Sequence, residues 1–544
     1  MNWPSETIGD QHPKGCAQAE STIEASVRGN SAIFGTFDST ARTLEAMSQA
    51  LSHRGSELST RRMRGFTIGS RYYDDRPHLA NVGDCVIAFA GAPFVIDRSD
   101  RLARFLDAEA LGASFRRFGA DFFRTLHGSF ALAIWIPDQN TILLVRDSFG
   151  SQSLAFATGN GTFDFASEYK ALARSPRRSR RIDRIAVDHF VGHGWAPAGH
   201  TFFKSISMVP PGSMLTWTDG HIEVEHFRRD IDRHQPPLRP IPPEKLAACA
   251  TEAITWHSQD TENRYGVMLS SGVDSAFMTA TLKHLYPHKE LHSFTVGYGQ
   301  GDPELLGAKE TSEHLGTIHH EIIVQPKDLT SLLRRTIEAV DNPGGYEEFP
   351  CLYALHKFAS NLVDVMFSGN VADTLFAGMP YHRDLPSGDG AIYRRLCQDL
   401  LHRDERLGAQ ELLAGHFGLS FRMPFAENSM IDLALETPDF QKLGARENKI
   451  IFRQAAAMIL PEEITSRPKR IQHLQYDKSM WHWIAERVDW LRSERLLETH
   501  DLLLPQVEAA LRHSACHQGD VHTFRPAWNA IAVATWASIY LETS

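Results

Sequence analysis

The chain has 544 residues and a formal net charge of −10, with 42% hydrophobic and 22% charged residues. A chain of this length exceeds one hydrophobic core and its composition is near the globular average, so we expect at least two folded domains and exclude a disordered or fibrous protein. The negative charge opposes a general attraction to nucleic acid phosphates, so nucleic acid is not an expected partner.

Residues 1–29 are polar and patternless, and we predict a flexible leader there because they lack the basic end and apolar run of a signal peptide. No uncharged apolar stretch reaches the ~20 residues that span a bilayer, so no membrane partner is expected. The six cysteines are widely spaced without a CxxC pair, which is typical of a reducing, cytoplasmic setting.

Short apolar runs separated by turn signals occupy residues 30–227. They are typical of an antiparallel sheet with a few helices packed on it, and they cover residues 31–37, 85–91, 130–136, 141–147 and 213–220. The stretch 228–245 is rich in proline and charge and can continue neither a strand nor a helix. We therefore predict an interdomain linker at 228–245.

Strand and helix patterns alternate in the second half, residues 246–544. The expected strands are 265–271, 291–298, 319–324 and 363–369, and the expected helices are 275–285 and a segment ending at Leu315. This alternation favours a parallel, doubly wound α/β domain. The C-terminal end has a helical pattern, and its predicted packing anchors are Trp481, Trp483, Trp490, Trp528 and Trp536.

A loop rich in serine joins the first of these strands to the first helix, with the sequence LSSGVDS from Leu269 to Ser275. A helix N-terminus presents unpaired N–H groups, Gly272 permits a close approach of the backbone, and the hydroxyls of Ser270 and Ser271 add donors. The C-terminal edge of a parallel sheet is also where doubly wound domains bind nucleotides. The loop predicts a phosphate site, and an ordinary serine-rich N-cap turn is the alternative.

Four further motifs follow the loop in order: SFTVGYGQGDPELLGAKETSEHLGTIHHE, FSGNVADTLFAG, FRMPF and SRPK. This order resembles the synthetase half of glutamine-dependent asparagine synthetases, and with the N-terminal half the resemblance covers nearly everything from Ser31 onward. The family loop reads SGGxDS, so Ser271 replaces a glycine, which implies some backbone strain. The resemblance implies an N-terminal Ntn-hydrolase-like antiparallel sheet sandwich and a C-terminal adenine-nucleotide α-hydrolase-like (PP-loop) parallel α/β domain with a helical C-terminus.

The resemblance also implies a site for ATP and Mg2+. Asp274 and Asp373 match the two carboxylates that hold magnesium against the phosphates, and Lys469 matches a lysine that offsets charge at the reacting phosphate. Weaker candidates for the same region are Lys449, Arg453 and Arg467. The implied nucleotide-binding residues are Leu269, Ser270, Ser271, Gly272, Asp274, Ser275, Val296 and Gly369. The implied reaction is adenylation of a carboxylate with release of pyrophosphate, followed by attack of an amine and release of AMP.

The acceptor side of the implied site departs from the asparagine synthetase pattern. Asn370 replaces the glutamate of the family motif SGEGSDE, and an amide cannot act as a general base. β-Lactam synthetases, which are similar, carry a tyrosine at this position. Tyr346, Glu347 and Glu348 of GGYEEF match a segment that faces the amino acid substrate in relatives. They are therefore candidates for a base or for binding an amine, with a solvated loop as the alternative.

The N-terminal half resembles a class II glutamine amidotransferase domain that has lost its reacting groups. SAIFGTF is similar to CGIFG, in which an N-terminal cysteine uses its own amine as a base, whereas Ser31 is an internal serine. Arg54 of LSHRGSE matches a ligand of the glutamine carboxylate, but Ala90 and Ala92 replace the amide and the acid of the family's NGE. RDSFGSQSLAFA and FASEYKALA resemble further family motifs. We therefore expect an intact fold without glutamine hydrolysis.

A lost glutaminase implies an amine that belongs to the substrate or to a second substrate. Two kinds of natural-product ligase in this family fit: β-lactam synthetases, and the macrolactam synthetases of lasso peptide biosynthesis, which join a peptide's N-terminal amine to an Asp or Glu side chain. PAWNAIAVATWASIYLE resembles the ends of lasso cyclases. Macrolactam formation in antibiotic-type biosynthesis is therefore the favoured interpretation, with a peptide substrate and a leader-peptide protease as expected partners.

Two alternatives stay open at this point, and two further classes are opposed by the sequence. In the first, the chain is a β-lactam synthetase-like or other small-molecule amide ligase. In the second, it is an asparagine synthetase that uses free ammonia. A scaffold without activity is opposed by the joint retention of Asp274, Asp373 and Lys469. A tRNA-modifying PP-loop enzyme is opposed because neither a basic surface nor reactive cysteines are evident.

Overall fold

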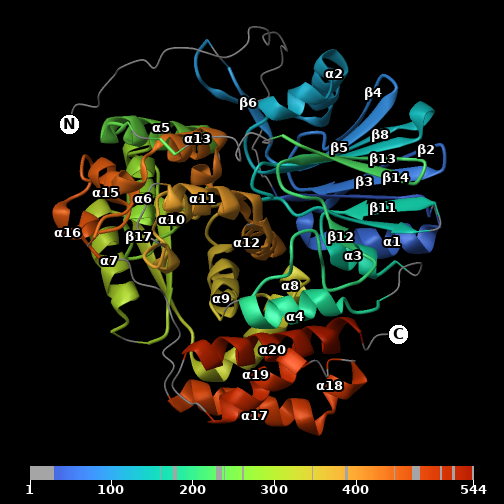
Figure 1. Ribbon diagram of the computed structural model, residues 1–544. Coiled ribbons are helices and arrows are strands. Elements are labelled where there is room, and N and C mark those ends of the chain that lie inside the picture. The colour runs from blue at the N-terminus through green and yellow to red at the C-terminus, as the bar shows by residue number, and fades with distance from the viewer. Residues whose placement is uncertain are drawn as a thin grey trace.

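The computed structural model describes residues 30–38, 40–97, 99–159, 161–175, 180–227, 236–237, 239–259, 263–299, 301–345, 347–385, 390–402, 404–445, 447–468, 478–500, 502, 505–516 and 521–541. The predicted leader and much of the predicted linker lie outside these residues, as do Tyr346 and Lys469. Figure 1 shows a half built on sheets, a half that mixes strands and helices, and a layer of C-terminal helices that lies against both.

The N-terminal half is a sandwich of two antiparallel six-stranded sheets. The first has the order β12-β10-β11-β1-β3-β2, with β1 Ser31–Thr36, β2 Glu57–Met63, β3 Phe66–Tyr72, β10 Ala155–Gly159, β11 Thr162–Ala166 and β12 Ser207–Met208. The second has the order β14-β13-β9-β8-β5-β4, with β4 Leu79–Val82, β5 Cys85–Gly91, β8 Phe130–Ile136, β9 Thr141–Arg146, β13 Ser213–Thr218 and β14 His221–His226. Their inner faces share one core, which contains Ile33, Phe66 and Trp135, as packed sheets do. The predicted sandwich is confirmed.

Short elements complete this half. A small hairpin pairs β6 Phe94–Ile96 with β7 Ala103–Phe105. The helices are α1 Ala41–Ala50, α2 Ala108–Phe118, α3 Tyr169–Ala173 and α4 Arg184–His193, with 3-10 turns η1 Ser52–Arg54, η2 Gly119–Thr125 and η3 Pro137–Gln139. Side chains of Thr40, Asp107 and Asp183 accept backbone N–H bonds at the starts of α1, α2 and α4, which explains where these helices begin.

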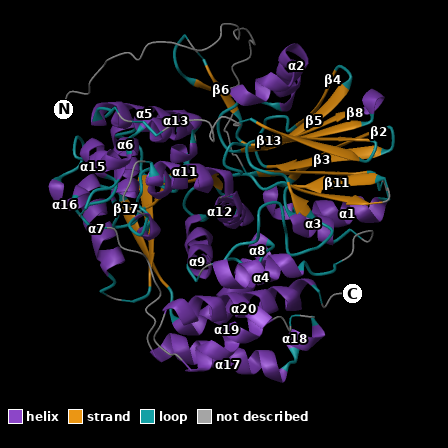
Figure 2. Cartoon of the chain, in the orientation of Figure 1, coloured by secondary structure: helices purple, strands orange, loops and turns teal. Residues whose placement is uncertain are grey.

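The C-terminal half is built on a five-stranded sheet with the order β17-β16-β15-β18-β19, and each neighbouring pair is parallel. The strands are β15 Tyr265–Met268, β16 Leu291–Gly297, β17 Ile318–Ile323, β18 Val365–Phe367 and β19 Ser420–Arg422. Alternate residues of β18 pack into different hydrophobic clusters, so both faces of the sheet are covered. The predicted parallel α/β domain is confirmed (Figure 2).

Helices flank this sheet. They are α5 Pro243–His257, α6 Val273–Leu285, α7 Pro303–Leu315, α8 Leu329–Val340, α9 Phe349–Ala359, α10 Ala372–Leu375, α11 Ala391–His402, α12 Asp404–His416, α13 Asn428–Glu436, α14 Asp439–Lys442, α15 Ile450–Ala456 and α16 Glu462–Thr465, with η5 Pro326–Asp328, η6 Pro380–His382 and η7 Pro424–Ala426. The start of α5 corrects the predicted linker, since Pro243 is helical. Proline suits the first helical position because an N–H there would have no helical partner.

The C-terminal helices are α17 Lys478–Ser493, α18 Leu496–Thr499, α19 Pro505–Cys516 and α20 Val521–Tyr540. Helix α20 packs against α4 of the N-terminal half and α8 of the C-terminal half, so it joins the two. Trp528 and Trp536 are 1% and 0% exposed, which confirms them as packing anchors. Among the described helices, none has the length and apolar character needed to cross a membrane.

Candidate active site

The serine-rich loop closes on itself between β15 and α6. Its first residue, Leu269, donates its N–H to the carbonyl of Phe294 at 2.9 Å, which ties the loop to the neighbouring strand β16. The hydroxyl of Ser270 accepts the N–H of Gly272 at 3.1 Å and lies 2.9 Å from the hydroxyl of Ser275. The loop therefore forms at the C-terminal edge of the parallel sheet, as predicted, with the start of α6 directly behind it.

Ser271 binds a carboxylate that the sequence did not reveal. Its N–H and its hydroxyl donate to the two carboxylate oxygens of Glu304, in α7, at 2.9 and 2.6 Å. The loop thus already holds an anion from its own chain. The expected backbone strain is wrong, because Ser271 is not among the residues with positive φ. A Cβ added to Gly307 would lie 2.6 Å from the Cβ of Ser271, so the glycine in α7 provides the space for the serine.

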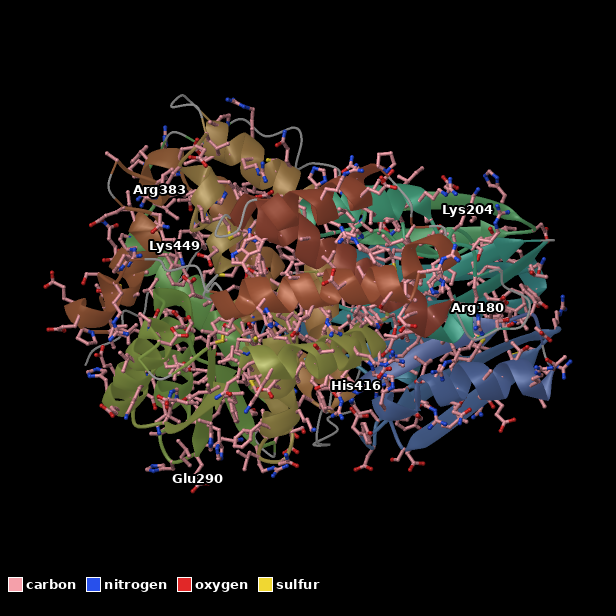
Figure 3. All side chains as sticks on the ribbon, turned by 90° about the horizontal axis from the view of Figure 1, so that it is seen from below. Arg180, Lys204, Glu290, Arg383, His416 and Lys449 are labelled. Carbon is pink, nitrogen blue, oxygen red and sulfur yellow. The ribbon has the colours of Figure 1, made fainter. Side chains whose placement is uncertain are left out.

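Two acids from separate helices meet at one lysine. Asp274 lies in the first turn of α6, and Asp373 lies in α10. The ammonium of Lys449 is 2.5 Å from Asp274 Oδ2 and 2.6 Å from Asp373 Oδ1, and the residue is 1% exposed. A Cβ on Gly378 would lie 2.0 Å from Asp373 Oδ1, so no other residue type fits there. Figure 3 shows Lys449 in the half that is remote from the N-terminal sheets.

This arrangement fits the magnesium ion that the sequence predicts. An ammonium already stands between Asp274 and Asp373 as a cation, within contact distance of both. Carboxylate oxygens are the hard ligands that Mg2+ prefers, and one or two of them suffice when phosphates and water complete the shell. The ion and the ammonium would compete for the same oxygens, so the side chain of Lys449 would have to withdraw.

The other predicted nucleotide-binding residues gather at the same sheet edge. Val296 is 4% exposed in β16, and the hydroxyl of the preceding Thr295 donates to the carbonyl of Leu269. Gly369 follows β18, and a Cβ there would lie 3.2 Å from the nitrogen of Ser275 and 3.4 Å from the Cβ of Asp274. The predicted set is brought together by the fold, and its binding of ATP stays a prediction.

Two arginines hold the segment that leads to Lys469, which itself lies outside the described residues. Arg453 donates to the carbonyls of Asn448 at 3.0 Å and of Arg467 at 2.9 Å. Arg467 donates to the carbonyl of Gly307 at 2.7 Å. Burial lowers the pKa of Arg453, while the acids of the site oppose that shift, which places its charge near them. These weaker candidates therefore support the loop and the SRPK segment.

Asn370 and Glu347 have partners from other helices. The side-chain amide of Asn370 donates to Gln410 Oε1 in α12. Glu347 is 2% exposed, and its carboxylate lies 3.9 Å from Arg525 in α20, so the solvated-loop alternative is wrong for this residue. Burial raises the pKa of Tyr298 well above its ordinary value, and Glu347 and Glu348 add to the rise, so both acids lie near the end of β16. Tyr346 lies outside the described residues.

Sequence reasoning missed Glu304, Gln410 and the contacts of Lys449. Glu304 is an acid in the first turn of α7, but nothing in the sequence pairs it with Ser271. Gln410 had no sequence signal, because nothing near it in the chain marks a partner for Asn370. In the sequence, Lys449 was only a weaker candidate for the predicted site, as a positively charged residue. Its φ of 55° is a left-handed conformation that side chains rarely adopt, and only the folded chain reveals it.

The pocket expected for glutamine is filled by the chain itself. Ser31 is internal, and its hydroxyl accepts the N–H of Gly91 at 2.9 Å. The preceding Asn30 is 0% exposed and accepts a hydrogen bond from Arg54 at 3.0 Å. Arg54 also donates to both carboxylate oxygens of Glu411, at 2.5 and 3.1 Å. The arginine predicted to match a glutamine ligand thus binds an internal carboxylate, and the expected loss of glutamine hydrolysis stays a prediction.

Comparisons with known proteins find relatives along most of the chain. Asparagine synthetase 1 (glutamine-hydrolyzing) of Bacillus subtilis (strain 168) is 25% identical over 529 residues, which cover 80% of this chain and 81% of the relative. Asparagine synthetase B (glutamine-hydrolyzing) of Escherichia coli (strain K12) is 25% identical over 383 residues, 67% of this chain and 64% of the relative. A solved glutamine phosphoribosylpyrophosphate amidotransferase from B. subtilis is 11% identical over 56% of this chain and 92% of its own, and its TM-score of 0.28 is too low for any argument.

Family profiles match both halves. The profile described as a glutamine amidotransferase domain matches residues 97–228. The profile described as asparagine synthase matches residues 251–410 and 395–538, which together make up more than half of the chain. The first match lies within the N-terminal half, after β6, and the second covers the parallel α/β half that carries Asp274, Asp373 and Lys449. The chain belongs to the asparagine synthase family.

Proposed function

We propose that this chain is an ATP-dependent, AMP-forming synthetase that makes an amide bond with an amine from a source other than glutamine. The observation that carries this proposal is the ammonium of Lys449 between Asp274 and Asp373, directly beside the loop that ends at Ser275. A nucleotide that binds together with Mg2+ requires a cation site next to a helix N-terminus, where the phosphates bind. Family membership supports the reaction class, because relatives are named asparagine synthetases.

In this proposal, Asp274 and Asp373 hold Mg2+, and the N-terminus of α6 binds the phosphates. Leu269 and Val296 line the adenine position. Bound ATP supplies the adenylyl group that activates a substrate carboxylate. Lys469 offsets negative charge at the reacting phosphate. On the acceptor side of the site, Tyr346 and Glu347 orient or deprotonate the amine.

The finer proposal is macrolactam formation within a peptide. The indole N–H groups of Trp528 and Trp536, in the helix that resembles the ends of lasso cyclases, donate to the carbonyls of Gly345 at 3.1 Å and Asp341 at 2.7 Å. That helix therefore supports the segment predicted to face the acceptor amine. Holding amine and activated acid together in one molecule would contribute through proximity. An asparagine synthetase that uses free ammonia is the second candidate, favoured by the names of the relatives.

The test uses the purified full chain with Mg2+ and ATP in three separate mixtures. The first contains candidate precursor peptides with a leader-peptide protease, the second aspartate with an ammonium salt, and the third aspartate with glutamine. In the first mixture we expect pyrophosphate and AMP in equal amounts. We also expect a peptide product that is lighter by one water than the protease-cleaved peptide. Asparagine in the second would move the assignment to the second candidate. Free glutamate in the third would refute the proposed amine source, and no pyrophosphate from any acid would refute the ligase.

A further inference from the structure

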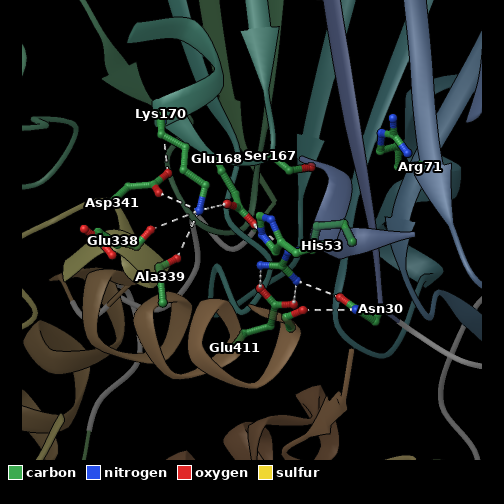
Figure 4. A network of polar contacts seen from close by, with 12 residues as sticks. Asn30, His53, Arg71, Ser167, Glu168, Lys170, Glu338, Ala339, Asp341 and Glu411 are labelled. Atoms are coloured by element: carbon green, nitrogen blue, oxygen red, sulfur yellow. Dashed lines mark hydrogen bonds and ion pairs between the residues drawn. The ribbon is translucent and has the colours of Figure 1, made fainter. Parts of the chain in front are cut away.

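A cluster of buried charges joins the two halves of the molecule, away from the nucleotide loop (Figure 4). Its members are each at most 4% exposed, and they come from both halves: Asn30, Arg54, Glu168 and Lys170 from the N-terminal half, and Asp341 and Glu411 from the C-terminal half. We call these six residues the interdomain cluster. Charges this deeply buried are costly unless each has a partner, so their contacts constrain how the halves meet.

One arm of the cluster holds helix α12. Arg54 binds Glu411, in α12, through two nitrogens at 2.5 and 3.1 Å, and its third nitrogen donates to Glu168 at 2.5 Å. Asn30 donates to the carbonyl of Gly415, also in α12, at 3.1 Å. A Cβ on Gly415 would lie 1.9 Å from Arg54 Nη1, so this helix carries a glycine where the guanidinium approaches its backbone. A bidentate arginine–carboxylate pair fixes orientation as well as distance.

The other arm holds the end of helix α8. The ammonium of Lys170 is 2.6 Å from Glu168 and 3.0 Å from Asp341, and it donates to the carbonyl of Ala339 at 3.2 Å. The backbone N–H of Lys170 also donates to Asp341 at 3.0 Å. Asp341 ends α8 in a left-handed conformation with φ 67°. The residue that starts the segment after α8 is therefore fixed by the N-terminal half.

Glu411 and Asp341, the two acids of the C-terminal half in the cluster, are both connected to the acceptor side of the proposed site. Glu411 follows Gln410, which accepts the side-chain hydrogen bond of Asn370, on the turn that leads to Asp373. Asp341 begins segment 341–347, which the structure describes at residues 341–345 and 347. The segment contains Glu347, and the carbonyls of Asp341 and Gly345 bind the two α20 tryptophans. The two arms therefore reach the two parts of the chain that flank the acceptor position.

We propose that Arg54 and Lys170 are positioning residues for the synthetase reaction. Through the interdomain cluster, the N-terminal half holds α12 and segment 341–347 in the geometry that the acceptor side requires. A domain that lacks glutamine hydrolysis thereby has a role in the reaction of its neighbour. The kinetic part of this inference rests on the proposed function, and its structural part does not.

Hydrogen–deuterium exchange of the full chain without ligands tests the structural part. Arg54→Gln leaves Glu411 and Glu168 without their guanidinium, so we expect exchange about tenfold faster in 404–416 and 341–345, with little change in 265–285. The matched control is Arg76→Gln, because Arg76 is also buried but pairs with Asp74 inside the N-terminal half. It should accelerate exchange only in that half. Unchanged exchange in 404–416 and 341–345, or equal acceleration there in both variants, would overturn the proposal.

Two further variants guard against simple unfolding. Arg54→Lys keeps the charge but loses the bidentate geometry. It should accelerate exchange in the same segments as Arg54→Gln, but by a smaller factor. Arg54→Gln combined with Glu411→Gln removes one of the two orphaned carboxylates, so it should recover melting temperature. Exchange in 341–345, which Glu411 does not touch, should stay as fast as in Arg54→Gln, because Glu168 still lacks its guanidinium. If the double variant is no more stable than Arg54→Gln alone, direct coupling of the two residues is refuted.

The kinetic part uses pyrophosphate release with whichever acid the chain accepts. We expect the KM of the acid or amine to rise about tenfold in Arg54→Lys, while the KM of ATP changes less than about twofold. Equal losses for ATP and for the acid would indicate a general structural role and refute positioning. If no acid is turned over, the proposed function fails, and the exchange experiment still decides whether the cluster holds α12 and segment 341–347.

Discussion

Lys449 defines the chemistry of the site at the scale of a single residue. It keeps two carboxylates together that would otherwise repel each other, and it does so from a left-handed backbone conformation that is unfavourable for a side chain bearing a Cβ. Such strain persists only where the surroundings dictate it. The lysine therefore holds the carboxylates of Asp274 and Asp373 side by side.

Replacing Asp274 by asparagine tests the role of this pair. The amide is nearly isosteric but carries no charge, so we expect pyrophosphate release to fall by about a thousandfold or more with no change in circular dichroism. Asp364→Asn is the matched control, because Asp364 pairs with the exposed Arg264 at the opposite edge of the same sheet. The role assigned to Asp274 is wrong if both variants retain the wild-type rate.

Replacing Lys449 by methionine tests the competition between ammonium and magnesium. The variant has two facing carboxylates without their common cation, and we expect the metal-free protein to lose about 3 kcal/mol of stability. Added Mg2+ should then raise its melting temperature more than that of the wild type, where the ion must displace the ammonium. Lys283→Met, in the last turn of α6, should behave like wild type. Equal magnesium shifts in all three proteins would contradict the competition.

Contacts between the loop and helix α7 show how one element shapes another. Ser271 stands where relatives have glycine, and the sequence alone indicated strain at that position. The fold relieves it by placing Gly307 of α7 against the serine and by supplying Glu304 as the acceptor for both serine donors. The loop and α7 therefore form one unit.

Gly307→Ala tests this unit. The new methyl group would meet the Cβ of Ser271 at 2.6 Å, so we expect a loss of about 1–3 kcal/mol in the free energy of unfolding. Adding Ser271→Gly should restore most of it, because the clashing atom is removed. Gly299→Ala is the control, since a Cβ there meets nothing within 4 Å. Chemical denaturation measures all four proteins, and failure of the second substitution to restore stability would refute the direct contact.

The interdomain cluster sets a property of the whole molecule. It contains two cations, Arg54 and Lys170, and three carboxylates, and the imidazole of His53 also lies 2.9 Å from Glu168. Burial raises the pKa of Asp341 to about 6, with Lys170 opposing the rise and Glu168 adding to it. Burial also raises the pKa of Glu411. The free energy of unfolding must therefore change with pH in the mildly acidic range.

Asp341→Asn tests this dependence. The folded pKa of about 6 lies above the unfolded value of 3.8, so the folded state holds the proton more tightly. The stability from this group is fully present below about pH 4 and is lost as pH rises through about 6. Asparagine cannot ionise, so the variant should gain up to roughly 3 kcal/mol relative to wild type across this window. Denaturant unfolding at several pH values measures the gain.

Asp97→Asn is the control for that experiment. Asp97 is half-buried, and hydrogen bonds from Ser99 lower its pKa to about 2, so its contribution is lost only as pH falls below the window. Its stability should follow the wild type from about pH 4 to pH 6. Parallel curves for Asp341→Asn and wild type would contradict the raised pKa of Asp341.

Local patterns were sufficient for most of the framework. β5 and β8 match the predicted runs residue for residue because long buried strands have a distinctive apolar pattern. Strand β19 was missed because only one of its three residues, Phe421, is apolar, whereas all three residues of the equally short β18 are apolar and were predicted. The start of α5 was missed because the prolines before Glu244 read as a helix breaker when they in fact begin a helix.

The sequence by itself determined the serine-rich loop between a strand and a helix, the acids Asp274 and Asp373 that follow the sheet, and the replacements at Ser31, Ala90 and Ala92, because contiguous motifs carry them. Tertiary structure alone decided that Lys449 bridges Asp274 from 175 positions away, and that Arg54 binds Glu411 from 357 positions away. The physical reason is that a charged side chain has no preferred partner in the sequence. Its partner is the opposite charge that packing delivers within contact distance and removes from water, and packing is settled only when the whole chain folds.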